Sequence, residues 1–222
     1  MRSYSQYCGL AKTLDVVGDR WTLLIVRELL VLGPARYTDL QHGLPGIATN
    51  LLVTRLREME EAGIVVREDA APPSVAKLFR LTPRGEQLEP ALMALGAWGG
   101  PLMGVPREDD VVRSHWLALP IRHYVVDRTP SRRPVAIEVR IGDELMVIET
   151  VGDGAVRARP GAAEKPDAVL DGAPHLVMGV LMGRLPLTAA CARGLRFHGN
   201  PAAVRRLQPR RTAPRKALRT AR

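Results

Sequence analysis

The chain has 222 residues and a formal net charge of +9, and hydrophobic residues make up 46% of it. Two cysteines are too few for a disulfide framework or a cysteine-based zinc site, and the sequence lacks the run of about eighteen apolar residues that a membrane span needs. Because residues 1–7 also lack the apolar core of a signal peptide, we expect a cytoplasmic protein.

The positive charge is concentrated at the C-terminal end of the chain. Residues 1–100 contain 11 Lys and Arg against 11 Asp and Glu, residues 101–208 contain 15 against 12, and residues 209–222 contain 6 against none. Net charge alone therefore does not predict a DNA-binding domain. We expect the Pro- and Arg-rich tail over 209–222 to be disordered and to add sequence-independent affinity for phosphate.

The first part of the chain predicts consecutive helices. Asp19 is placed to cap a helix over residues 21–32, which is apolar almost all round, as core helices are. Gly33-Pro34 ends that helix. Residues 38–41, Thr-Asp-Leu-Gln, fit a capping box at the start of a short helix that ends near Gly43.

An amphipathic helix is predicted over residues 49–62. Leu52, Leu56 and Met59 recur on one face, and the opposite face is polar, with Asn50, Thr54, Arg57 and Glu61.

A β-hairpin follows, with strands over 64–66 and 78–81, and Thr82-Pro83 caps a further helix that runs to about residue 98. A short helix, a turn, an amphipathic helix and a two-stranded wing form the winged helix-turn-helix plan. We therefore expect a DNA-binding domain over residues 1–100.

A second domain is expected over residues 107–208, after a Gly- and Pro-containing linker at 101–106. It begins with a predicted helix over 109–119. Strands are predicted over 135–141, 145–151, 155–158, 168–170 and 195–198, and helices over 175–182, 186–191 and 201–207. The predicted fold class is α+β, with an antiparallel sheet in this domain.

Ordered motifs across residues 7–99 match a known family: Gly18-Asp19-Arg20-Trp21-Thr22-Leu23-Leu24, Arg36-Tyr37-Thr38-Asp39-Leu40, Leu44-Pro45-Gly46-Ile47-Ala48-Thr49-Asn50-Leu51-Leu52 and Leu81-Thr82-Pro83-Arg84-Gly85. They resemble the HxlR family of winged-helix regulators. The resemblance implies a homodimer, formed by the first and last helices of the domain, that binds a pseudo-palindromic operator on double-stranded DNA. It also favours a repressor over an activator.

In the second domain, residues 166–172, 181–185 and 194–201 resemble the sterol carrier protein 2-like (SCP2-like) fold. That fold implies an apolar cavity for a lipid or acyl ligand, and beside a DNA-binding domain it suggests an effector sensor. The candidate cavity residues are Leu176, Val177, Val180, Leu181, Leu185 and Leu187. Ordinary core packing is an equal alternative for each of them. At the level of the whole protein, a lipid-binding protein or a dimerisation module without a cavity are the competing hypotheses.

The helix from Thr49 is the candidate for the major groove, which admits one helix. Asn50 suits adenine, Thr54 a thymine methyl or a phosphate, and basic residues before the short helix and on the wing suit phosphates. The predicted DNA-binding residues are Arg36, Tyr37, Thr38, Thr49, Asn50, Thr54, Arg55, Arg57 and Lys77. For Arg55, a structural ion pair with Glu28 or Glu58 is the alternative.

Cys8 is a candidate redox-sensing residue by the family resemblance, but the preferred interpretation is a packed small side chain, as it is for Cys191. The histidines lack zinc-ligand spacing, so no metal is expected. No phosphate-binding glycine loop and no nucleophile–base pair was found, and we expect neither a cofactor nor an enzyme.

Overall fold

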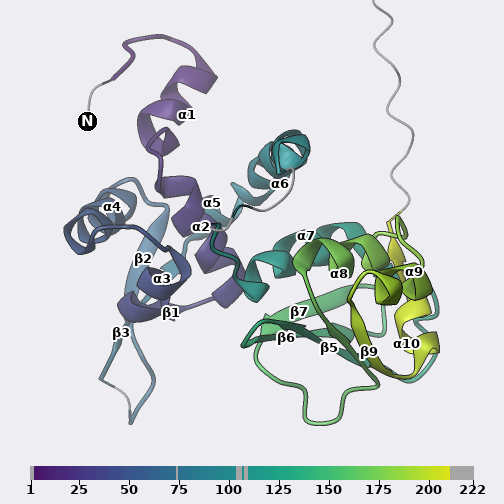
Figure 1. The fold of residues 1–222 in the computed structure, drawn as a ribbon. Coiled ribbons are helices and arrows are strands. Elements are labelled where there is room, and N and C mark those ends of the chain that lie inside the picture. Colours follow the sequence, from purple (N-terminus) through teal and green to yellow (C-terminus); the bar gives the residue numbers. More distant parts are fainter. Residues whose placement is uncertain (1–2, 74, 104–106, 108–109, 211–222) are drawn as a thin grey trace, which may run out of the picture. The chain divides into compact units, whose positions relative to one another are not determined.

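The computed structural model describes residues 3–73, 75–103, 107 and 110–210. It divides the chain into two compact units, Met1–Leu119 (unit 1) and Pro120–Arg222 (unit 2) (Figure 1). Residues that follow the expected linker therefore contribute to unit 1 as far as Leu119. Within the described residues, no helix combines the length and the apolar character needed to cross a membrane. The tail beyond residue 210 lies outside the described residues.

Unit 1 has the winged helix-turn-helix order that the sequence predicts. Its elements are α1 (Gly9–Val17), α2 (Thr22–Leu32), β1 (Ala35–Arg36), α3 (Tyr37–Gly43), α4 (Thr49–Glu61), β2 (Val65–Asp69), β3 (Lys77–Leu81), α5 (Pro83–Glu86), α6 (Glu89–Gly99), and the 3-10 helices η1 (Gly100–Leu102) and η2 (Ser114–Leu117). The strands pair antiparallel in the order β1-β3-β2. The hairpin of β2 and β3 projects as the wing (Figure 1).

The core of unit 1 forms around α2, as its all-round apolar character predicts. Ile25 and Val26 are fully buried, and they belong to a cluster with Leu40 of α3, Leu52 of α4 and Phe79 of β3. Each element of the helix-turn-helix and of the wing therefore buries part of its apolar face in one common core.

The start of α3 differs from the predicted capping box. The N-cap is Arg36, whose backbone N–H donates to Asp39 Oδ2 at 2.9 Å, and Thr38 lies inside the first turn. The reason is β1, because Ala35 and Arg36 pair with β3 and keep the backbone extended up to Arg36. The Thr82 cap is confirmed, since Gly85 N donates to Thr82 Oγ1 at 3.1 Å.

Unit 2 is an α+β unit. Its elements are α7 (Ala118–Tyr124, which begins at the end of unit 1), β4 (Val125–Asp127), β5 (Ala136–Ile141), β6 (Glu144–Thr150), β7 (Val156–Pro160), β8 (Ala168–Asp171), α8 (Pro174–Leu181), α9 (Leu187–Ala192), β9 (Arg196–Gly199), α10 (Pro201–Arg206) and β10 (Leu207–Pro209). The expected helix over 109–119 is present only from Ser114, in η2 and the start of α7, because the backbone at Arg113 is extended; residue 109 lies outside the described residues.

The sheet of unit 2 is mixed: most of its strands pair antiparallel, as expected, but one pair is parallel. Its strand order is β7-β6-β5-β8-β9, and β5 pairs with β8 in parallel. The chain leaves β7 at one edge and crosses over to the far side of β5, where β8 runs in the same direction as β5 and β7. Ile137, Val139, Met146 and Leu170 are fully buried beneath α7 and α8, which lie across one face (Figure 1).

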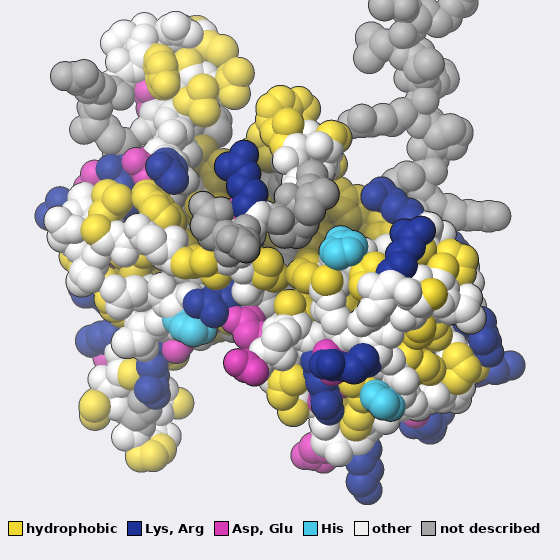
Figure 2. All heavy atoms as spheres, in the orientation of Figure 1, with side chains coloured by type: hydrophobic (Ala, Val, Ile, Leu, Met, Phe, Trp, Pro, Cys, Tyr) yellow, Lys and Arg dark blue, Asp and Glu magenta, His cyan; other side chains and the backbone are white. Residues whose placement is uncertain are grey.

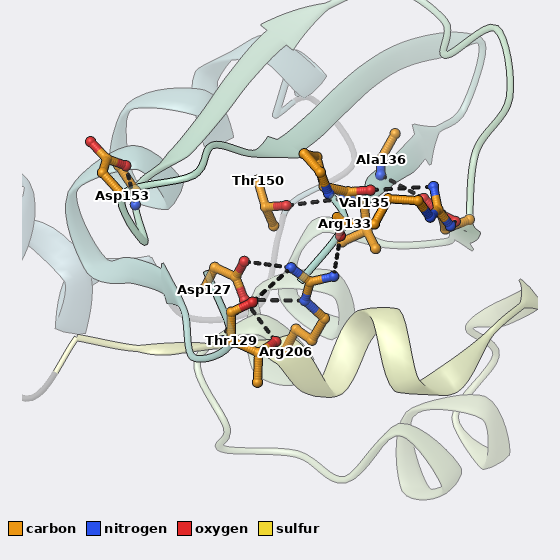
Figure 3. A network of polar contacts seen from close by, with 11 residues as sticks. Asp127, Thr129, Arg133, Val135, Ala136, Thr150, Asp153 and Arg206 are labelled. Atoms are coloured by element: carbon orange, nitrogen blue, oxygen red, sulfur yellow. Dashed lines mark hydrogen bonds and ion pairs between the residues drawn. The ribbon is translucent and has the colours of Figure 1, made fainter. Parts of the chain in front are cut away.

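A buried ion pair joins the end of α10 to the strands of unit 2 (Figure 3). Arg206 Nη2 donates to Asp127 Oδ2 at 2.7 Å, and other guanidinium nitrogens donate to Asp127 Oδ1 and to the backbone oxygen of Arg133. The Asp127 side chain is 1% exposed. A second carboxylate, Asp167, accepts from Arg133 and from the backbone N–H of Ala136.

Candidate nucleic-acid interface

Helix α4 separates an apolar face from a polar one, as predicted. Leu52, Leu56 and Met59 are buried against the core of unit 1. Asn50 and Arg57 are exposed on the other side. Val53, 54% exposed, lies on the same side and gives it a small apolar contact surface.

Two side chains of α3 hold the first residue of α4. Tyr37 Oη donates to the backbone oxygen of Thr49 at 3.0 Å, and Gln41 Nε2 donates to Thr49 Oγ1 at 3.0 Å. Tyr37 and Thr49, both predicted to contact DNA, are thus engaged in fixing the angle between the two helices. The sequence predicted only a capping role for Gln41. Its contact with Thr49 was missed because the two residues lie on opposite sides of the turn between α3 and α4.

The remaining candidates on α4 have different partners. Thr54 Oγ1 donates to the backbone oxygen of Asn50 at 2.9 Å, which leaves its oxygen able to accept. Arg57 is 3.8 Å from Glu61 and its side chain is 70% exposed, so this ion pair is loose.

Arg55 forms an ion pair within unit 1, which was the alternative to a DNA contact. Its Nη1 donates to Glu58 Oε2 at 2.6 Å, and its Nε lies 3.3 Å from Asp19 Oδ1. The side chain is only 21% exposed. We therefore treat Arg55 as a residue that fastens α4 to the start of α2.

The wing carries cross-strand ion pairs. Lys77 pairs with Asp69, and Arg80 Nε lies 3.2 Å from Glu68 Oε2, so each cation of β3 faces an acid of β2. At the start of α3, Arg36 and Thr38 are both exposed. The basic residues expected to meet phosphates therefore lie on the elements before and after α4, at the start of α3 and on the wing.

Helices α1 and α6 expose apolar side chains, which Figure 2 shows in yellow over both helices. Leu10 of α1 is 68% exposed and Trp98 of α6 is 75% exposed, and they are accompanied by Tyr7, Leu14, Leu95, Leu102 and Met103. Leu10 and Leu14 share one face of α1, as do Leu95 and Trp98 on α6. Exposed apolar patches of this kind are typical of interaction sites.

Both cysteines are exposed, so their interpretation as packed core residues is wrong. Cys8 is the residue before α1, and the backbone amides of Ala11 and Leu10 lower the pKa of its thiol below the ordinary value. A larger fraction of Cys8 is therefore thiolate at neutral pH than in an ordinary cysteine.

The rate of alkylation at different pH values tests whether the pKa of the Cys8 thiol is lowered. We expect the pH–rate profile of Cys8 with iodoacetamide, followed by peptide mass spectrometry, to have its midpoint below about 8.5, the ordinary cysteine pKa. Cys191→Ser should leave the profile unchanged, whereas Cys8→Ser should remove it. A midpoint at or above the ordinary value would contradict the prediction. Since the thiolate is the form that reacts with oxidants, the same experiment bears on the redox hypothesis.

The candidate cavity residues all lie on or next to α8 and α9. Leu176, Val177, Val180 and Leu181 are buried, and Leu185 and Leu187 are half-buried. Leu185 packs back against Gly179 of α8, where an added Cβ would lie 3.2 Å from Leu185 Cβ. Among the described residues, no group of His, Cys, Asp and Glu is arranged to hold a metal ion.

The short helix, the turn, the exposed polar helix fixed to it and the two-stranded wing define unit 1 as a winged helix-turn-helix domain. Residues 16–105 match the HxlR-like helix-turn-helix family. The chain is 36% identical over 102 residues to the HTH-type transcriptional regulator YkvN of Bacillus subtilis, an alignment that covers 45% of this chain and 82% of YkvN. It is 35% identical to sll1512 of Synechocystis over 41% of this chain and 67% of that regulator. The chain therefore belongs to the HxlR-like family.

Solved structures give a weaker likeness. The crystal structure of PA1607 is 34% identical and covers 72% of this chain and 92% of its own, with a TM-score of 0.43. The redox regulator HypR in its reduced form is 30% identical over 44% of this chain and 95% of its own, with a TM-score of 0.39. The family assignment therefore rests on the sequence matches.

Proposed function

We propose that this protein is a transcriptional regulator that binds double-stranded DNA as a homodimer, with α4 of each copy in the major groove. The observation that carries the proposal is the polar, exposed face of α4, which is held in place from behind by the core and by Tyr37 and Gln41. The HTH-type regulators to which the chain is related support it.

In this proposal the candidate residues divide into three groups. Asn50 and Thr54 read bases, because an amide pairs with adenine and a threonine meets a thymine methyl. Arg57, Arg36, Thr38 and Lys77 contact phosphates or, for Arg57, guanine. Tyr37, Thr49 and Arg55 fix the position of α4.

Fluorescence anisotropy with a labelled duplex from the DNA upstream of the protein's own gene tests the proposal. We expect Asn50→Ala to weaken binding by about 1–3 kcal/mol and to relax specificity at one base pair. Arg57→Ala should weaken binding as well, whereas the matched control Arg157→Ala, an exposed arginine on β7, should not. Equal affinity of the unsubstituted protein for this duplex and for one of shuffled sequence would contradict the proposal.

The apolar faces of α1 and α6 are the proposed dimer interface, where a second copy of the chain packs against them. In this proposal the two-fold dimer must place its two copies of α4 about 34 Å apart, the spacing of successive major grooves. We expect sedimentation analysis to give a mass near twice 24.3 kDa. Trp98→Glu should give the monomer mass, because a charge would be buried in an apolar interface. Glu86→Lys, an exposed change on α5, should leave the dimer intact. A monomeric unsubstituted protein would contradict this interface.

For unit 2 we propose an SCP2-like effector domain that binds an apolar small molecule and controls a repressor. The apolar α8, packed on a mixed sheet, supports this proposal. Titration with a fluorescent fatty acid tests it, and the absence of saturable binding would favour the alternative of a dimerisation module. Saturable binding without any operator preference would favour the lipid-binding protein.

A further inference from the structure

The core helix of unit 1 carries a carboxylate with no exposed surface. Glu28 Oε1 accepts hydrogen bonds from Arg27 Nε at 2.9 Å, from Arg27 Nη2 at 2.7 Å and from the indole Nε1 of Trp116 at 2.9 Å. Its other oxygen, Oε2, lies 2.7 Å from His115 Nε2. Glu28 is 0% exposed, and His115 is 8% exposed.

Two of these three partners come from one short segment, Ser114–Leu117, which we name the clasp. A carboxylate in the core is tolerated only when hydrogen bonds and cations replace its water. Arg27 is itself held by the clasp, because its guanidinium lies 4.3 Å from the centre of the Trp116 ring. The clasp lies beyond residues 16–105, which match the family.

Glu28 also touches the helix-turn-helix. Gly43, the last residue of α3, lies so close to the Glu28 carboxylate that a Cβ at this position would overlap Oε2. The position of the carboxylate therefore limits where α3 ends. Since α3 in turn holds Thr49 through Tyr37 and Gln41, a continuous series of contacts runs from the clasp to the first residue of α4.

We propose that the clasp sets the position of α3 through Glu28 and so controls DNA binding from a site that makes no DNA contact. The effect on DNA rests on the proposed function. Unit 2 begins at Pro120, shortly after Leu117, so the clasp is the part of unit 1 next to unit 2 along the chain.

Hydrogen–deuterium exchange on the full chain tests the clasp. Trp116→Phe keeps an aromatic ring for Arg27 and removes the N–H donor, and His115→Phe keeps a ring and removes Nε2. We expect both variants to exchange the α3 amides about tenfold faster, which corresponds to the loss of one hydrogen bond to a charged group. Exchange in α4 and the wing should increase less than in α3, and exchange in unit 2 should stay unchanged. The exposed His175→Phe on α8 is the control.

The same variants are then titrated with the operator duplex, and we expect weaker binding. Unchanged α3 exchange in both variants would overturn the clasp, as would exchange that is accelerated equally throughout unit 1, which indicates general destabilisation. Faster α3 exchange with unchanged DNA affinity would overturn its control of DNA binding. If the unsubstituted protein shows no operator preference, the proposed function fails, and the exchange experiment still decides whether the clasp positions α3.

Discussion

Replacing Glu28 with alanine is expected to lower the free energy of unfolding of unit 1 by about 3–5 kcal/mol, the usual cost of breaking a buried ion pair. The substitution leaves Arg27, Trp116 and His115 facing a void without their common acceptor. All three tryptophans of the chain lie in unit 1, so urea unfolding followed by tryptophan fluorescence reports on this unit.

Two further variants separate charge from burial. Glu28→Gln keeps the shape and one acceptor oxygen, so it should cost less, about 1–3 kcal/mol. Glu86→Ala removes an exposed carboxylate on α5 and should change the stability by no more than about 0.5 kcal/mol. A loss below about 1 kcal/mol for Glu28→Ala would show that the cluster does not stabilise unit 1.

Local sequence patterns were sufficient for the main elements of unit 1. The spacing of Leu52, Leu56 and Met59 predicts both the existence of α4 and the side that it buries, because helical periodicity acts over a few residues. The cap at Thr82 is equally local. Local sequence does not determine where α3 begins, because its start depends on the pairing of Ala35 and Arg36 with β3, about forty residues further along.

The candidate site also combines features that local sequence predicts with features that depend on distant parts of the chain. The exposure of Asn50 and Arg57 follows from the period of α4. The partners of Arg55 and Glu28 depend on tertiary contacts, and His115 lies 87 positions from Glu28. A signal was nevertheless present, since a carboxylate within the apolar run of α2 requires partners from elsewhere in the fold. In unit 2, the parallel pairing of β5 with β8 was missed because the alternation of apolar residues does not specify strand direction.

Asp127 and Arg206 should make unit 2 sensitive to acid. Burial raises the pKa of the Asp127 carboxyl, but hydrogen bonds from Arg206 and Thr129 outweigh it and hold the pKa below its ordinary value. A carboxyl with a lowered pKa in the folded state stabilises that state above its unfolded pKa, about 3.9, and loses this contribution as the pH falls through the folded value. We therefore expect the stability difference between the unsubstituted protein and Asp127→Asn to be largest near neutral pH and to shrink below about pH 4.

Arg206→Ala tests the other half of the pair and should cost about 3–5 kcal/mol near neutral pH, because Asp127 remains buried without its cation. Unit 2 contains no tryptophan, so its unfolding is followed by circular dichroism. The part of the circular dichroism change that occurs without a change in tryptophan fluorescence reports on unit 2. Arg205→Ala, the exposed neighbour on α10, removes the same charge and should have little effect. The stability difference between the unsubstituted protein and Asp127→Asn could instead stay constant from about pH 7 to pH 3. This result would contradict the prediction, because it would mean that folding does not change the pKa of the Asp127 carboxyl.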